Sequence, residues 1–455
     1  MSDIDKLRNK MDEVTLEMIK MLKTRTDIAR EIGDVKKNIG KAVTDESREN
    51  SLREKVVALS KEINLDEEIA AKFFNFLLNE SIKVQSTNKQ THLSIFLKAK
   101  SLEQQGKKII HMEVGEPDFL PPPIVKEALG EVYDKGFVKY GQAKGIPIFR
   151  EALAKYISEK FNVTNVTSEN IIVSPGARFS IFTAITALLN PGDEIIVIEP
   201  AWPAYKDCAL NSGIKIRTIN TTLEDNWEPS IEKIRKMINS NTKMIVLNYP
   251  NNPTGKILPE ELQDEIVEVA KENDLYILSD EIYSEYKKTK WKSILCYNYE
   301  KSIVTQSFSK SHAMTGFRIG YAITDHAIVE KMAKLQALCL TNVSEPIQYT
   351  AMKALEADTS NNTNTVEDRL KILIKEAKEI GLDFVVPDGA MYLFARVNKE
   401  GFDGVEFANN TLDKGLAIAP GEGFGNYKDH IRISACQDEK TLTEGMNILR
   451  EILSE

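Results

Sequence analysis

The sequence has few cysteines and no long apolar segment. Its four cysteines are scattered along 455 residues without paired spacing, which argues against a disulfide framework or a zinc site and fits the reducing cytoplasm. Hydrophobic residues reach 42%, yet no apolar run approaches membrane-spanning length, and the charged start MSDIDKLRNKMDEV is not expected to be a signal peptide. We therefore predict a cytoplasmic protein with no metal and no membrane partner.

Basic residues are outnumbered by acidic ones, 59 Lys and Arg against 68 Asp and Glu. The formal net charge is −9, and an acidic chain of this kind is a poor candidate for binding nucleic acid. The length predicts two or three domains, with ample apolar residues for large cores.

Proline is absent from residues 1–85, and glycine occurs there only at Gly33 and Gly40. This composition predicts helix throughout, with a turn at 40–44 and further helices near 45–63 and 66–84. Apolar residues of the first helix alternate in steps of three and four: Ile4, Leu7, Met11, Val14, Met18, Met21, Ile28, Ile32, Val35 and Ile39. Such a heptad seam calls for a partner helix, which we expect from a second subunit.

Arg25 interrupts this seam. It is either part of a buried ion pair that fixes the helix register, or a cation directed into a cavity for an anion. Polar residues also end the apolar faces of the next two helices, among them Asp45, which could simply cap a helix.

Together these residues resemble the site of the small all-helical chorismate mutases. The resemblance covers the segment without gaps, and the matching residues are Arg8, Arg25, Lys36, Asp45, Arg48, Glu49, Ser81 and Gln85. It implies an intertwined homodimer in which Arg8 reaches the other subunit's site.

The chorismate mutase reaction explains the residue types. Chorismate rearranges to prephenate without a nucleophile or a proton transfer, so catalysis must come from positioning and electrostatics. The resemblance implies that Arg8 and Arg25 bind two carboxylates, with Ser81 or Arg48 assisting. Lys36 and Gln85 would donate to the ether oxygen, while Asp45 and Glu49 would accept from the ring hydroxyl or orient the cations.

A second group of polar residues surrounds Lys310 in TQSFSKSHAMTGFRIGY, residues 305–321. A strand-like run ends there in a turn of small residues that holds this single lysine. Such a lysine can form an imine with a carbonyl cofactor, with Ser307 and Arg318 holding a phosphate. Taken alone, such a string more often holds an ordinary solvated loop lysine.

Four motifs in order resemble the fold-type I pyridoxal-phosphate aminotransferases. They are NYPNNPTG at 248–255, SDEIYSEY at 279–286, SFSKSHAMTGFRIGY at 307–321 and HIRIS at 430–434. The resemblance covers roughly residues 90–455 and implies pyridoxal 5'-phosphate as the cofactor.

Strand and helix signals alternate in this part of the chain, as in a doubly wound, mostly parallel α/β sheet. Strands are predicted at 171–174, 194–199, 215–219, 244–248, 276–279, 302–307 and 319–323. We also expect a strand pair at 387–397, a strand at 431–436, and a loop at 358–365. The predicted domains are a helical domain at 1–88 and an aminotransferase at 89–455, with a large part at about 125–335 and a smaller α+β part from 89–124 and 336–455.

The resemblance assigns the cofactor contacts. Ala177 and Arg178 would meet the phosphate at a helix N-terminus, Trp202 would stack on the ring, and Asp280 would pair with the ring nitrogen. The other expected contacts are Asn252, Tyr283, Ser307, Lys310, Arg318 and Tyr140, the last lent to the neighbouring subunit. Gly115 and Arg432 would contact the substrate, the arginine through its α-carboxylate.

The substrate stays open at this level. A mutase fused to an aminotransferase favours prephenate, aminated to arogenate, and Arg178 replaces a lysine that binds the distal carboxylate in some relatives. However, Leu120 and Pro121 replace an Asp-Thr pair found in such relatives. Phenylpyruvate and hydroxyphenylpyruvate stay possible, as does an aspartate aminotransferase whose helical domain only dimerises or senses an effector.

Overall fold

The computed structural model describes residues 3–38, 45–86 and 92–454. The chain divides into two compact units, Met1–Lys89, here the helical unit, and Gln90–Glu455, here the sheet unit. In the described ranges no helix has the length and apolar character needed to cross a membrane.

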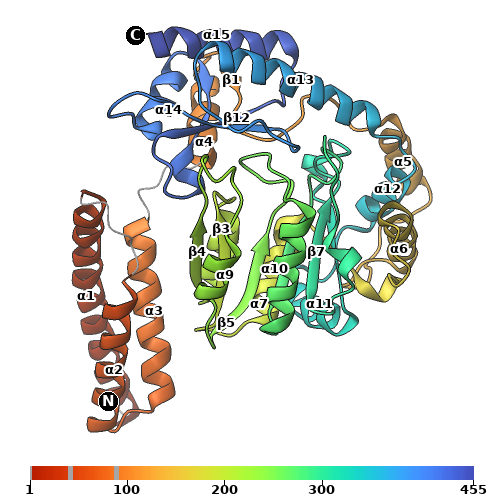
Figure 1. Cartoon of the computed structure of the whole chain (residues 1–455). Helices are drawn as coiled ribbons and strands as arrows, with labels where there is room; N and C mark the ends of the chain where they lie inside the picture. The colour runs from red at the N-terminus through yellow and green to blue at the C-terminus, as the bar shows by residue number, and fades with distance from the viewer. Residues whose placement is uncertain (1–2, 39–44, 87–91, 455) are drawn as a thin grey trace. The chain divides into compact units, whose positions relative to one another are not determined.

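The helical unit consists of α1 (Asp3–Asn38), α2 (Glu46–Glu62) and α3 (Glu67–Ser86), drawn in Figure 1. Both α1 and α2 contact α3. Ala29, Ser60, Ala70 and Phe74 are buried between them, and three of these side chains are small enough to let the helices approach closely. The predicted turn at 40–44 and most of the linker after α3 lie outside the described residues.

The heptad seam of α1 is left exposed within a single chain. Leu7, Met11 and Met21 are 65%, 69% and 70% exposed, although long apolar side chains are ordinarily buried. One copy of the helical unit therefore does not bury its own apolar stripe.

The sheet unit is built around a seven-stranded sheet with the strand order β2-β8-β7-β6-β5-β3-β4. Neighbouring strands are parallel, except that β8 runs antiparallel to β2 and β7. The strands are β2 (Ile171–Ser174), β3 (Glu194–Glu199), β4 (Lys215–Asn220), β5 (Thr242–Leu247), β6 (Tyr276–Asp280), β7 (Ser302–Ser307) and β8 (Gly320–Thr324).

Helices cover both faces of this sheet (Figure 1). Because strand side chains alternate, Ile196 packs in one core and its neighbour Ile195 in the other. The first core includes α6 (Pro147–Phe161), α9 (Ile231–Met237), α10 (Glu260–Glu272) and α12 (Glu345–Ala354), with α5 (Pro123–Asp134) packed on α12. The second includes α7 (Ala177–Leu188), α8 (Ala204–Asn211) and α11 (His326–Leu340).

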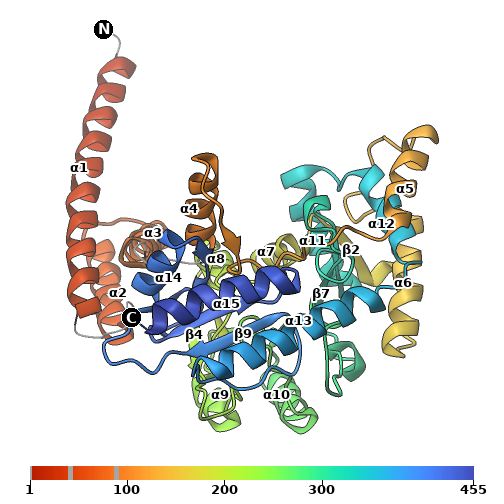
Figure 2. The ribbon, with the colours of Figure 1, turned by 90° about the horizontal axis from the view of Figure 1, so that it is seen from above.

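A smaller layer follows at the C-terminal end of the chain. The antiparallel strands β11 (Ala419–Pro420), β12 (His430–Ser434) and β9 (Tyr392–Arg396) form one sheet, and β1 (Ile110–His111) pairs with β10 (Leu416–Ala417). Helices α13 (Ser360–Glu379) and α15 (Glu439–Ser454) pack together on this layer (Figure 2). The remaining helices here are α4 (His92–Gln104) and α14 (Gly404–Asp413).

Two local predictions are wrong. Residues 387–397 hold one strand, β9, rather than a pair, because the segment before β9 bonds elsewhere: the amides of Asp388 and Gly389 donate to the carbonyl of Gly255, and Gly389 forms an isolated bridge with Lys287. The expected loop at 358–365 is mostly the first turns of α13. Asn and Thr side chains suggested a loop there, but packing of Val366 at the end of this stretch favours the helix.

Candidate active site

One cavity of about 350 Å³ lies beyond the carboxyl ends of the large sheet's strands. Parallel sheets bind ligands at this edge. Every site residue expected in the sheet unit lines it, apart from Tyr140: Gly115, Ala177, Arg178, Trp202, Asn252, Asp280, Tyr283, Ser307, Lys310, Arg318 and Arg432.

Lys310 follows β7, and its ammonium donates a hydrogen bond to the carbonyl of Gly115. The hydroxyl of Tyr286 donates to the carbonyl of Lys310 at 2.8 Å, which fixes the lysine backbone. Burial lowers the pKa of Lys310, and the charges of Arg432 and Arg318 act in the same direction. The amine is therefore easier to deprotonate than an ordinary lysine.

Asp280 ends β6 and is 1% exposed. Its Oδ2 accepts from the hydroxyl of Tyr205 at 2.7 Å, and its Oδ1 accepts from Thr305 at 3.2 Å. Burial raises the pKa of Asp280 to about 6, although both hydrogen bonds oppose this shift. A bound cation would therefore lower the free-energy cost of keeping this buried carboxylate ionised.

Arg432, in the middle of β12, is 1% exposed. Its guanidinium donates to the side-chain oxygen of Asn252 at 2.8 Å and to the carbonyl of Glu113, and its buried Nε has no hydrogen-bond partner in the described structure. The possibility that Arg432 points outward from its strand is excluded. A buried cation held by neutral oxygens is suited to bind a carboxylate.

A second cationic group lies near the first turn of α7. Arg318 donates to the carbonyl of Thr315 at 2.8 Å, and a Cβ on Gly176 would lie 2.6 Å from its guanidinium. Burial lowers the pKa of Arg318, and the charge of Arg178 lowers it further. Two arginines beside the amides of a helix N-terminus make an anion site.

Two aromatic predictions have different outcomes. Trp202 lines the cavity, with the guanidinium of Arg178 4.7 Å from its ring centroid. Tyr140 is 89% exposed and is absent from the residues that line this cavity. Its expected role in a neighbouring subunit's site stays a prediction.

Several residues of this site were not predicted from the sequence. Tyr205 bonds Asp280, Asn248 donates to the carbonyl of Asp280 at 2.9 Å, and Tyr392 lies 2.7 Å from Tyr283 between hydroxyl oxygens. Asn248 belongs to the NYPNNPTG motif and could have been chosen for that reason. The two tyrosines had no such signal, because each meets its partner from a distant part of the chain.

A buried acid and a histidine support the segment before Gly115. Glu113 is 0% exposed, and its Oε1 lies 2.8 Å from Nδ1 of His111, whose Nε2 lies 3.1 Å from Glu103. The hydrogen bond to Glu113 raises the pKa of His111 despite partial burial. The same short segment offers its carbonyls at Glu113 and Gly115 to Arg432 and Lys310.

In the helical unit, the structure brings Arg25 and Ser81 together. The guanidinium of Arg25 donates to the hydroxyl of Ser81 and, at 2.7 Å, to the carbonyl of Leu77. Partial burial lowers the pKa of Arg25. These contacts with neutral oxygens favour an arginine directed at an anion over a buried ion pair.

The other expected residues of this unit are more dispersed. Asp45 caps α2 by accepting from the amide of Arg48 at 3.1 Å, and Glu49 accepts from the amide of Asp45 at 3.3 Å. The capping role that the sequence left open is therefore present. Arg8 is exposed on α1, and Lys36 lies near its end. Gln85 belongs to α3, but its side chain lies outside the described part.

Comparisons with known proteins agree with this geometry. The model of the family "Aminotransferase class I and II" matches residues 107–449, and that of "Chorismate mutase type II" matches residues 7–86. The chain belongs to the class I and II aminotransferases. Its helical unit is a type II chorismate mutase domain, so the protein joins an isomerase to a transferase in one chain.

Individual relatives cover most of the sheet unit. The aspartate aminotransferase of Thermotoga maritima is 35% identical over 362 residues, which are 78% of this chain and 94% of that protein. The aspartate/prephenate aminotransferase of Thermus thermophilus is 31% identical, over 82% of this chain and 98% of its own length. The solved Thermus thermophilus aspartate aminotransferase with maleate superposes with a TM-score of 0.77, at 30% identity, over 81% of this chain and 98% of that one.

Aminotransferases of this class use pyridoxal 5'-phosphate, and the residues present fit it. The positive charges of Arg178 and Arg318 repel each other, and a phosphate dianion bound at Arg318 would reduce this repulsion. The buried carboxylate of Asp280 suits a protonated ring nitrogen, and Lys310 presents an amine to the same cavity. The cavity therefore offers positive charge to the cofactor's phosphate and negative charge to its ring nitrogen.

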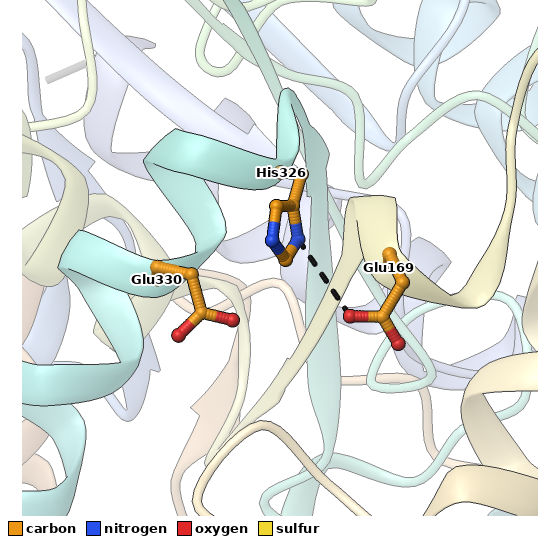
Figure 3. Close-up of side chains that lie close together, drawn as sticks. All are labelled: Glu169, His326 and Glu330. Carbon is orange, nitrogen blue, oxygen red and sulfur yellow. Dashed lines mark ion pairs between the residues drawn. The ribbon is translucent and has the colours of Figure 1, made fainter.

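Glu169, His326 and Glu330 form a separate cluster (Figure 3). Their side-chain oxygen and nitrogen atoms, the types that could bind a metal ion, lie within 4.8 Å of one another. Lys144 donates to Glu169 at 3.2 Å and to Glu330 at 2.7 Å, and Arg150 donates to Glu169 at 3.4 Å. These two cations already offset the carboxylates, so the cluster is a surface ion-pair network.

The raised pKa of Asp280 predicts a pH dependence of stability. The folded pKa of about 6 lies above the ordinary aspartate value of 3.8, so the cofactor-free protein gains stability as pH falls from about 6 towards 4. Asp280→Asn removes this dependence, and we expect it to stabilise the cofactor-free protein by about 3 kcal/mol at pH 7.5. Urea denaturation between pH 4 and 8 measures the difference, which should fall steadily and become small near pH 4.

The control for this prediction is Asp413→Asn, at an exposed aspartate of α14. It should match the unmodified protein at every pH. A difference between Asp280→Asn and the unmodified protein that stays constant with pH would contradict the assignment.

Proposed function

We propose that this enzyme converts chorismate to prephenate in its helical unit and transaminates a keto acid of the aromatic pathway in its sheet unit, with prephenate as the favoured acceptor. The observation that carries the proposal is the presence of two arginines, Arg432 and Arg178, in one cavity of a chain that also holds a mutase domain. Prephenate carries two carboxylates, and one arginine could bind each.

In the mutase unit, Arg25 and Ser81 would hold a substrate carboxylate, since they already lie in hydrogen-bond contact. Arg8 of a second subunit and Arg48 would bind the other carboxylate. Lys36 and Gln85 would donate to the ether oxygen, where negative charge develops, and Asp45 and Glu49 would orient the ring hydroxyl. No step in this reaction needs a proton donor or a nucleophile.

Removal of Arg25 tests the mutase assignment. Arg25→Ala should lower the mutase rate about 100- to 1,000-fold, as the loss of one preorganised donor typically does, and leave the transaminase rate intact. Arg30→Ala is the matched control, because Arg30 lies on the same helix but pairs with Asp27 at 3.0 Å on the surface. A mutase rate unchanged in Arg25→Ala would remove the assignment.

In the aminotransferase unit, Arg432 would bind the α-carboxylate of both amino donor and acceptor. Pyridoxal 5'-phosphate, when bound, supplies a carbonyl and an electron-withdrawing ring that together permit exchange of an amino group. Nζ of Lys310, with its lowered pKa, would remove the proton from the α-carbon of the amino donor and would deliver a proton to the α-carbon of the keto-acid acceptor. Asp280 would hold the ring nitrogen protonated, while Asn252 and Tyr283 would donate to the phenolic oxygen.

The phosphate would bind Ser307, Arg318 and the first amides of α7, at Ala177 and Arg178. Tyr140 of a second subunit would add a hydroxyl. Trp202 would cover the ring, and Gly115 would let the substrate approach the backbone. Leu120 and Pro121 replace the Asp-Thr pair of some relatives, so the threonine hydroxyl is missing here, and Leu120 itself is 85% exposed. Discrimination between acceptors with and without a distal carboxylate would therefore rest on Arg178.

A keto-acid panel tests the substrate. With glutamate or aspartate as donor and saturating cofactor, we expect turnover of prephenate to exceed that of phenylpyruvate. Arg178→Leu should reduce kcat/KM for prephenate and oxaloacetate about 10- to 100-fold, the usual range for a charge-assisted hydrogen bond, and affect phenylpyruvate far less. Arg235→Leu, at an exposed arginine, is the control.

Three results of this panel would change the proposal. Preference for oxaloacetate would favour an aspartate aminotransferase. Equal losses for all acceptors in Arg178→Leu would assign Arg178 to the cofactor rather than to the substrate. Preference for phenylpyruvate would exclude the distal carboxylate as a recognition element.

We also propose a homodimer, because the exposed stripe of α1 needs a partner and Arg8 and Tyr140 are both exposed in one chain. Sedimentation equilibrium at micromolar concentration should give twice the mass of one chain. Met11→Lys combined with Met18→Lys should weaken the association, since it places charges in the stripe. A monomeric unmodified protein with full mutase activity would contradict the proposal.

A cytoplasmic location stays a prediction.

A further inference from the structure

Tyr392 is a buried residue of the aminotransferase cavity to which no role has been assigned so far. It begins β9 and is 2% exposed, and its Cα pairs with that of Ser434 on β12. Its side chain lines the cavity together with Gly115, Tyr283 and Arg432. It therefore lies where the substrate-binding and cofactor-binding groups meet.

The hydroxyl of Tyr392 contacts two of these groups. It lies 2.7 Å from the hydroxyl of Tyr283, and the two rings are 5.6 Å apart with an interplanar angle of 81°. It also fills the space over Gly115, where an added Cβ would lie 1.8 Å from it. The hydroxyl is thus fixed from two sides.

The ring of Tyr392 contacts the third group. The guanidinium of Arg432 lies 4.4 Å from its centroid, and the ring of Phe424 lies 4.8 Å from the same guanidinium. Such contacts stabilise a desolvated cation through the π-electrons of the ring. The ring and the hydroxyl of Tyr392 therefore act on different partners.

We propose that Tyr392 is a positioning residue with two separable parts: its hydroxyl donates to Tyr283, and its ring holds Arg432 ready for the substrate carboxylate. The inference rests on the proposed function of the cavity, in which Tyr283 donates to the cofactor and Arg432 binds the carboxylate.

Hydrogen counting fixes the direction of the hydroxyl contact. Each tyrosine hydroxyl has one hydrogen to donate. If Tyr283 gives its hydrogen to the phenolic oxygen of the cofactor, it can only accept from Tyr392. Burial raises the pKa of Tyr392 to about 12, so its hydroxyl keeps its hydrogen at the pH values of an enzyme assay.

Two variants separate the two parts. Tyr392→Phe removes the hydroxyl and keeps the ring, whereas Tyr392→Leu removes both. Tyr427→Phe is the matched control, because Tyr427 is also buried and its hydroxyl donates to the carbonyl of Thr221 at 2.9 Å, outside the cavity lining. Lys310→Ala provides the baseline without the lysine–cofactor chromophore.

The readouts are made on full-length protein loaded with pyridoxal 5'-phosphate. The pKa of the lysine–cofactor chromophore is measured from near-visible absorbance against pH. The half-saturating concentrations of glutamate and aspartate are measured from the absorbance change that each donor causes without an acceptor. The first readout follows Tyr283, and the second follows Arg432.

Tyr392→Phe should raise the chromophore pKa by about half a unit to one unit, since one neutral hydrogen bond that stabilises the phenolic anion is weakened. Its half-saturating concentrations should stay within about twofold, because the ring remains. Tyr392→Leu should show the same pKa shift and also raise both concentrations about 5- to 30-fold. Tyr427→Phe should match the unmodified protein in both readouts.

An unchanged chromophore pKa in Tyr392→Phe, with a normal titration of the unmodified protein, would overturn the hydroxyl part. If Tyr392→Phe weakened donor binding as much as Tyr392→Leu, the ring part would fall. A chromophore missing from the unmodified protein, or surviving in Lys310→Ala, would instead overturn the proposed function of the cavity. Because Tyr392→Phe changes a single buried hydroxyl, the test does not depend on whether Tyr392→Leu folds.

Discussion

A buried guanidinium that contacts only neutral groups is the constraint on which the aminotransferase site depends. Arg432 is surrounded by the amide oxygen of Asn252, the carbonyl of Glu113 and two aromatic rings, and no ion pair of Arg432 occurs among the described residues. Removing a cation from water is costly unless it finds compensating partners. The neutral groups compensate in part and leave the cation ready for an incoming carboxylate.

In the mutase domain, Arg25 is held in a similar way. Arg25 donates to a carbonyl and a hydroxyl, and partial burial lowers its pKa. In both units, neutral oxygens orient an arginine without neutralising its charge. Two unrelated folds, one all-helical and one built on a mostly parallel sheet, thus hold an arginine in the same way, through neutral oxygens.

The regular elements of the sheet unit could be predicted because their signals are local. Strand Ser302–Ser307 and strand Ile171–Ser174 have the predicted limits, since apolar β-branched runs bounded by turn residues fix them. The start of α13 was missed because Asn and Thr are weak helix formers, and packing against distant segments decides such cases.

The site was predictable where sequence motifs carry its residues, as for Lys310, Asp280 and Arg432. Tyr205, Tyr392 and the His111–Glu113 pair were not, because each gains its meaning from a contact that only the folded chain creates. For the same reason, the sequence could not decide between the two interpretations of Arg25. Its partners on α3 become visible only when α1 and α3 pack together.

The contact between Gly115 and Tyr392 links two positions from opposite ends of the aminotransferase unit. The hydroxyl of Tyr392 occupies the volume that any side chain at position 115 would need. Enlarging residue 115 therefore requires a smaller residue at position 392, whereas a smaller residue at position 392 needs no change at position 115. Homologues that gain a methyl group at the first position should have lost the aromatic hydroxyl at the second.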